Sequence, residues 1–96
     1  MIETHFLVSG RVQHVGFRRF VAHHAVALGV IGFVRNRIDG SVEIYASSSL
    51  DLLNKFIQLC QKGPLFASVT EVTILPVDDT LKQLVDNGGF KILPTE

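Results

Sequence analysis

Hydrophobic and polar positions change their spacing several times along the chain, and each change marks a predicted element. Residues 5–9 form a short apolar run closed by Gly10, which is typical of a buried strand. From Phe17 the apolar positions recur every three or four residues as far as Leu28, which predicts a helix. Gly29 follows directly, and glycine is the usual residue at a helix end. The first third of the chain therefore predicts a strand followed by a helix.

The middle of the chain predicts a β-hairpin and a second helix. Apolar and polar residues alternate over residues 30–37 and again over 41–46, as they do in strands. Asp39 and Gly40, which lie between them, are a strong signal for a tight turn. A serine cluster then offers an N-cap for residues 50–60, whose apolar side chains form one helical stripe.

The last third is expected to complete the sheet. Residues 69–75 predict a strand, residues 80–86 a loop or helical turn, and residues 89–93 a short edge strand. The order strand, helix, strand, strand, helix, strand is that of the split β-α-β unit. We therefore expect an α+β, ferredoxin-like sandwich, with two helices on one face of a mainly antiparallel sheet of four or five strands. Residues 1–96 are expected to form a single domain.

Composition and charge narrow the function classes. Nine Lys and Arg balance nine Asp and Glu over the 96 residues, so the net charge is zero. A polyanion partner requires a basic surface, so we expect no nucleic acid partner and no membrane partner. The longest apolar stretch, residues 25–34, is far shorter than the ~20 residues of a membrane span. Cys60 is the only cysteine, which excludes an intramolecular disulfide. These features predict a soluble, cytoplasmic protein.

The segment with the clearest chemistry is residues 10–18, which connects the first strand to the first helix. A helix start leaves backbone N–H groups without partners, and the helix dipole adds positive charge there. Arg18 would place a planar cationic fork beside those donors, a combination suited to a phosphoryl group. The alternative interpretation of Arg18 is a solvated arginine at an ordinary helix start.

Two motifs, one at residues 10–18 and one at residues 32–43, carry a family resemblance. Residues 10–18, Gly-Arg-Val-Gln-His-Val-Gly-Phe-Arg, resemble the acylphosphatase signature G-[RK]-V-Q-G-V-x-[FY]-R at every specified position except His14. A second signature of that family, G-x-V-x-N-x-x-D-G-x-V-E, is matched by Gly32, Val34, Asn36, Asp39, Gly40, Val42 and Glu43. Both motifs stand in the expected order and separation, and the resemblance extends from about residue 3 to residue 93.

The resemblance implies hydrolysis of the carboxyl–phosphate anhydride of a small-molecule acyl phosphate, without a metal, a cofactor or a covalent intermediate. By motif position, Arg18 binds the phosphate and Asn36 holds the attacking water. Phosphoryl transfer demands mainly positioning and charge stabilisation, which these two side chains can supply without titrating near neutrality. The loop that would bind substrate through its backbone N–H groups consists of Gln13, His14, Val15, Gly16 and Phe17.

His14 is the one departure from the first motif, because the family usually has glycine there. Glycine at that position implies a left-handed backbone or close approach of the substrate, and histidine adopts the left-handed region only at some cost. We interpret His14 as a solvent-facing residue. The alternative is a donor to the phosphate that makes activity depend on pH where histidine titrates.

Other functions remain open at this point. One is a non-catalytic module that binds phosphate or carbamoyl phosphate, against which the presence of Asn36 argues. Another is an RNA-binding module of the same topology, for which Arg37 and Tyr45 are weak evidence. The adjacent His23 and His24 point in different directions on a helix, so we expect no metal site. We expect the protein to be a monomer.

Overall fold

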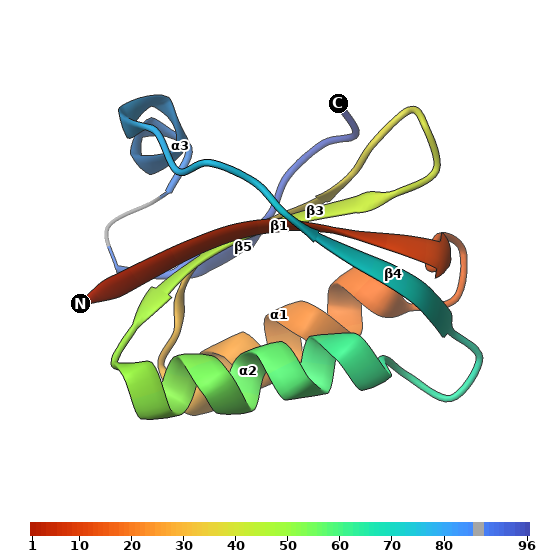
Figure 1. The fold of residues 1–96 in the computed structure, drawn as a ribbon, viewed down its shortest axis with the longest axis horizontal. Coiled ribbons are helices and arrows are strands. Elements are labelled where there is room, and N and C mark those ends of the chain that lie inside the picture. The colour runs from red at the N-terminus through yellow and green to blue at the C-terminus, as the bar shows by residue number, and fades with distance from the viewer. Residues whose placement is uncertain (86–87) are drawn as a thin grey trace.

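The computed structural model describes residues 1–85 and 88–96 and shows a five-stranded sheet with helices on both of its faces (Figure 1). The elements in chain order are β1 (Ile2–Arg11), α1 (Phe17–Leu28), β2 (Ile31–Asn36), β3 (Val42–Ser48), α2 (Leu50–Lys62), β4 (Ser68–Ile74), α3 (Asp79–Gln83) and β5 (Phe90–Ile92). The predicted order of strands and helices is confirmed. β1 is longer than the apolar run that predicted it, because residues 2–4 pair with β3 and Gly10 and Arg11 pair with β4.

The strands lie in the order β4-β1-β3-β2-β5. All neighbours pair antiparallel except β2 and β5, which are parallel. This confirms the α+β, ferredoxin-like fold and the mainly antiparallel sheet, with the fifth strand present at the edge beside β2. The connection predicted at residues 80–86 contains the short helix α3. The last residue of that prediction, Asp86, lies outside the described residues.

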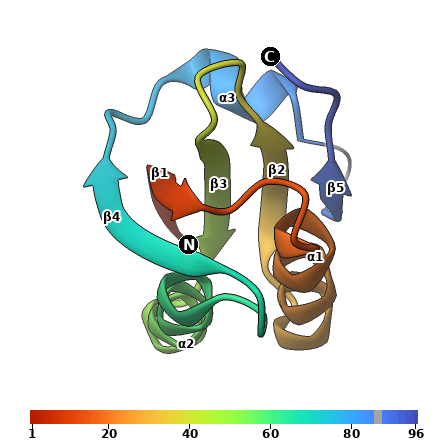
Figure 2. The same ribbon diagram turned by 90° about the vertical axis from the view of Figure 1, so that its right-hand side faces the viewer.

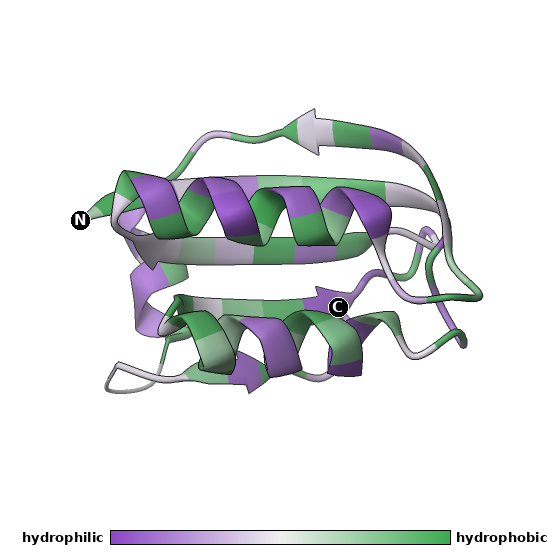
Figure 3. Ribbon diagram, turned by 90° about the horizontal axis from the view of Figure 1, so that it is seen from below, coloured by the Kyte–Doolittle hydropathy of each residue, from purple (hydrophilic) through white to green (hydrophobic). Residues whose placement is uncertain are grey.

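The main core lies between the sheet and the two long helices. α1 and α2 lie side by side on one face of the sheet, as Figures 1 and 3 show. Each helix buries a stripe three to four residues apart, represented by Phe17, Val21 and Ala25 on α1. On their outer surface hydrophilic and hydrophobic residues alternate in bands (Figure 3). No helix within residues 1–85 and 88–96 is long and apolar enough to cross a membrane.

A smaller cluster covers the opposite face of the sheet. Leu81 of α3 packs there against Phe33 and Tyr45, which are fully or nearly fully buried. Phe33 therefore faces away from α1 and α2, as its alternation with Val34 requires. Burial, together with a hydrogen bond to Glu3, raises the pKa of Tyr45 to about 12. The third helix thus closes a second, smaller core.

Candidate active site

The loop between β1 and α1 ends in a helix start with free backbone donors. Gly16 is the N-cap of α1 and has a left-handed backbone (φ 78°), and no side chain caps the helix. The first turn carries no acidic residue. Among the residues that the structure describes, no acceptor takes the N–H groups of residues 14–18. These donors and the positive end of the helix dipole form an anion-binding arrangement.

The bend that directs the chain into this loop depends on Gly10. The pairing of β1 with β4 shifts register between Ser9 and Gly10, and Gly10 has a φ of 119°. A Cβ atom at Gly10 would lie 2.2 Å from the backbone oxygen of Ser68. Only glycine allows the two backbones to come this close, so the start of the loop is defined by a residue without a side chain.

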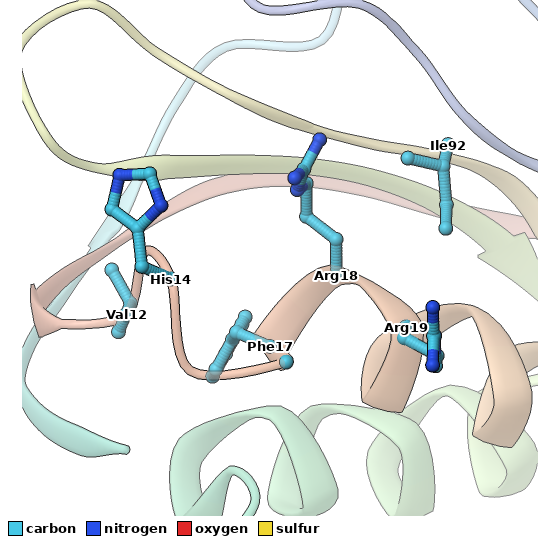
Figure 4. Close-up of a pocket in the computed structure, with 7 residues that line it drawn as sticks. Val12, His14, Phe17, Arg18, Arg19 and Ile92 are labelled. Carbon is cyan, nitrogen blue, oxygen red and sulfur yellow. The ribbon is translucent and has the colours of Figure 1, made fainter. Parts of the chain in front are cut away.

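A hollow of about 390 Å³ opens beside the loop and the first turn of α1. Its walls are formed by Val12, His14, Gly16, Phe17, Arg18, Arg19 and Ile92. Figure 4 shows Arg18 rising from the first turn of α1 on the same side as His14. Arg18 is partly buried, and within the described part of the chain it has no ion-pair partner. Its guanidinium is therefore free to bind an anion in this hollow, which we call the phosphate hollow.

The other loop residues divide into anchors and open positions. Phe17 is buried, and Val15 packs against the core, so both fasten the loop to the body of the protein. His14 is exposed and has a left-handed backbone (φ 62°), which makes it the only residue besides glycine with a positive φ among those described. The left-handed conformation expected from the family's glycine is therefore present. The solvent-facing interpretation of its side chain also agrees with its exposure.

Gln13 ties the loop to the β2–β3 hairpin. Its side-chain nitrogen donates to the carbonyl oxygens of Arg37 at 2.8 Å and Ser41 at 2.9 Å. The connection from β1 to α1 passes the ends of β3 and β2 (Figure 2). The motif indicated only a backbone role for Gln13. Its side-chain contacts span 24 positions to Arg37 and 28 positions to Ser41, so no local pattern signals them.

Asn36 is the last residue of β2 and is only 6% exposed. Alternation puts its side chain on the face of Val34, which packs with the two long helices. Its side-chain oxygen is buried and has no hydrogen-bond partner within the described residues. An unpartnered buried acceptor is rare in folded proteins and requires an explanation. Asn36 does not line the phosphate hollow itself, and Gln13 provides the connection between the loop and the hairpin after Asn36.

The opposite face of the same hairpin is held by a buried carboxylate. Glu43 is 2% exposed and contacts His5 at 2.6 Å, Arg35 at 2.7 Å and Arg37 at 3.2 Å. Burial acts to raise the pKa of Glu43, but the hydrogen bonds and charges of Arg35 and His5 outweigh it and lower the pKa below 4.5. The second ring nitrogen of His5 donates to the carbonyl oxygen of Pro76 at 2.9 Å. This cluster therefore fixes β3 against β1 and β2.

Three residues that line the phosphate hollow, Val12, Arg19 and Ile92, lie outside the predicted substrate-binding residues 13–18. Val12 belongs to the first motif, and Ile92 was expected only as part of an edge strand. The adjacency of Arg19 to Arg18 is a weak sequence signal for Arg19. No local signal places Ile92, because β5 reaches β2 from more than fifty residues away in the chain.

Other potentially reactive groups lie outside the phosphate hollow. Cys60 is 1% exposed on α2, and burial raises the pKa of its thiol well above the ordinary value, so we interpret it as a packing residue. His23 and His24 contact each other edge to face. No group of three or more metal-ligating side chains occurs within residues 1–85 and 88–96.

Comparisons with known proteins point to one family. The acylphosphatase family model matches residues 4–92. An acylphosphatase of Rhodopseudomonas palustris is 42% identical over 90 residues, which are 93% of this chain and 91% of that protein. One from Caldivirga maquilingensis is 45% identical over 92 residues, covering 95% of this chain and 93% of that protein. The crystal structure of acylphosphatase from Bacillus subtilis superimposes with a TM-score of 0.83 at 32% identity, covering 97% and 99% of the two chains. The chain belongs to the acylphosphatase family.

Proposed function

We propose that this protein is an acylphosphatase that hydrolyses acyl phosphates by direct attack of water on a bound phosphate. The observation that carries the proposal is the phosphate hollow, in which Arg18 has no ion-pair partner and the N–H groups of the helix start have no acceptor among the described residues. Arginine forms paired hydrogen bonds with phosphate oxygens, and the N–H groups of residues 13–17 add fixed donors. Arg18 and these N–H groups stabilise the negative charge that is spread over the equatorial phosphate oxygens in the transition state.

Asn36 is proposed to hold the attacking water. Its side-chain amide can both accept and donate a hydrogen bond, which orientation of a water molecule requires. Its buried side-chain oxygen is unpartnered among the described residues, so it is available as the acceptor. The Gln13 contacts to the hairpin keep the loop and the end of β2 in a fixed relationship. Because the substrate is an activated anhydride, positioning of the reactants and charge stabilisation supply most of the rate acceleration.

The direct test measures hydrolysis of acetyl phosphate and benzoyl phosphate by purified protein, with a chelator present and no metal added. We expect turnover with both substrates. Arg18→Ala is expected to lower kcat/KM by a factor on the order of 1,000, since it removes charge-assisted hydrogen bonds to the transition state. Arg11→Ala removes an exposed arginine from the end of β1 and is the matched control. Full activity of Arg18→Ala would overturn the assignment.

The non-catalytic alternative makes a different prediction in the same experiment. A module that only binds phosphate or carbamoyl phosphate would bind inorganic phosphate in an Arg18-dependent way but would turn over neither substrate. Measurement of phosphate binding by calorimetry beside the kinetics therefore separates the two functions.

We further propose that residues 1–96 act as a single-domain monomer in the cytoplasm without a nucleic acid partner. The balanced charge supports the absence of a polyanion partner. The buried single Cys60 suits a reducing compartment. Light scattering of the purified protein and a salt-dependent RNA-binding assay test the oligomeric state and the partner.

A further inference from the structure

A second hollow adjoins the phosphate hollow along the outer side of α1. It has a volume of about 430 Å³ and is bounded by Arg19, Ala22, His23, Val26, Ala27 and Ile92. We call it the side groove. Except at Arg19 and His23, its walls are aliphatic. One wall comes from α1 and the other from β5, so the side groove exists only because β5 pairs beside β2.

The helix wall of the side groove is a single stripe. Arg19, Ala22, His23 and Val26 are spaced by three, four and seven residues, which places them on one face of α1. Val26 is 67% exposed and Ile92 is 47% exposed. Two aliphatic side chains on adjoining elements thus stay open to solvent next to a site for a charged group. This arrangement suits a ligand with one anionic end and one apolar end.

Arg19 lies where the two hollows meet. Together with Ile92 it lines both the phosphate hollow and the side groove. It is exposed, and among the described residues it has no ion-pair partner. In an acyl phosphate the bond that breaks lies between the phosphate and the acyl group. A substrate whose phosphate occupies the first hollow and whose acyl group occupies the second would present this bond near Arg19.

We infer that the side groove binds the acyl group of the substrate, that this group is apolar, and that Arg19 receives the leaving carboxylate. The inference rests on the proposed function. The water oxygen forms a bond to phosphorus while the bond from phosphorus to the bridging oxygen breaks. The electron pair of that bond leaves with the carboxylate, and both water protons remain on the phosphate. The negative charge that develops on the bridging oxygen is stabilised by the guanidinium of Arg19.

Val26 lines the side groove but not the phosphate hollow, so it tests the acyl site separately. Val26→Gln is expected to lower kcat/KM for benzoyl phosphate, relative to acetyl phosphate, by about five- to tenfold, the equivalent of one to two buried methylene groups. Leu50→Gln changes another exposed aliphatic residue, on α2, and is expected to leave the ratio unaltered. An unaltered ratio in Val26→Gln would overturn the acyl site. The ratio cancels any loss of folded protein.

Arg19 is tested with a series of substituted benzoyl phosphates whose leaving acids differ in pKa. Arg19→Gln is expected to make kcat fall more steeply as the pKa of the leaving acid rises. Arg19→Lys is expected to restore most of the wild-type dependence of kcat on that pKa. A parallel loss for all substrates would show that Arg19 does not stabilise the leaving carboxylate. If the wild-type protein hydrolyses neither acetyl nor benzoyl phosphate, the proposed function itself fails, which is a distinguishable result.

Discussion

The side-chain nitrogen of Gln13 donates to the carbonyl oxygen of Arg37 at 2.8 Å and thereby joins the anion-binding loop to the residue that follows Asn36. The same nitrogen donates a second hydrogen bond to the carbonyl oxygen of Ser41, on the other side of the hairpin turn. One side chain thus ties the proposed phosphate-binding loop to the end of β2. The geometry of the proposed site depends on this contact as well as on Arg18 and Asn36.

Gln13→Ala is expected to lower both activity and stability. The carbonyl oxygens of Arg37 and Ser41 keep their bonds from backbone N–H groups, so only the two side-chain hydrogen bonds are lost. At about 0.5–1.5 kcal/mol each, this loss should reduce the free energy of unfolding by about 1–3 kcal/mol. The looser loop should lower kcat by about tenfold or more, because small displacements of positioned groups are costly. Urea denaturation and steady-state kinetics measure the two effects. Gln58→Ala on the exposed side of α2 is the control, and equal behaviour of the two variants would contradict the role of Gln13.

Asn36→Ala is expected to separate activity from stability. Removal of the water-orienting amide should lower kcat by about a hundredfold or more and change KM little, because the contact acts on the chemical step. The buried side-chain oxygen has no partner within the described residues, so no hydrogen bond of the protein is lost with it. The free energy of unfolding should therefore fall by less than about 1 kcal/mol. A large loss of stability with unchanged kcat would indicate a structural role.

His14→Gly is expected to stabilise the protein. A non-glycine residue in the left-handed region costs about 1–2 kcal/mol, and His14→Gly removes this cost. Glycine also gives the unfolded chain more freedom, which cancels about 0.5–1 kcal/mol of the stabilisation. A net increase of about 0.5–1 kcal/mol in the free energy of unfolding follows. The exposed side chain predicts the same pH profile of kcat/KM between pH 5 and 8 in both proteins. A profile that changes on substitution would instead assign the imidazole a role in catalysis.

Glu43 is expected to make stability depend on pH in the acid range. Its pKa is lowered in the folded state from the ordinary value of 4.5, because Arg35 and His5 outweigh the effect of burial. The stabilisation is therefore fully present above pH 4.5 and is lost as the pH falls through the lowered pKa. Urea denaturation between pH 2 and 7 should show this loss in the wild-type protein and a weaker acid dependence in Glu43→Gln.

The same substitution should cost stability at neutral pH. Glu43→Gln leaves Arg35 without its buried counter-charge, which predicts a loss of about 3–5 kcal/mol at pH 7. Glu71→Gln on exposed β4 is the control. Should Glu43→Gln fail to fold, titration of the Glu43 carboxyl by NMR in the wild-type protein still measures the lowered pKa. A value at or above 4.5 would contradict the prediction.

The sequence by itself determined the features that depend on neighbouring residues. Helix α1 was predictable from the spacing of its apolar positions, and its end at Gly29 from the residue type alone. The loop of residues 10–18 was found because its motif is continuous in the chain. Backbone conformation at a glycine position, helix capping and strand alternation are all local properties, so pattern and composition carry them.

The tertiary structure decided the features that join distant parts of the chain. The parallel pairing of β5 with β2 brings Ile92 to the end of the phosphate hollow and forms one wall of the side groove. The contact of Gln13 with Arg37 has no local signal either. Such contacts depend on how the sheet is ordered and how α1 lies on it. The amino-acid sequence therefore determined which loop is proposed to bind an anion, whereas only packing decided which surface adjoins that loop.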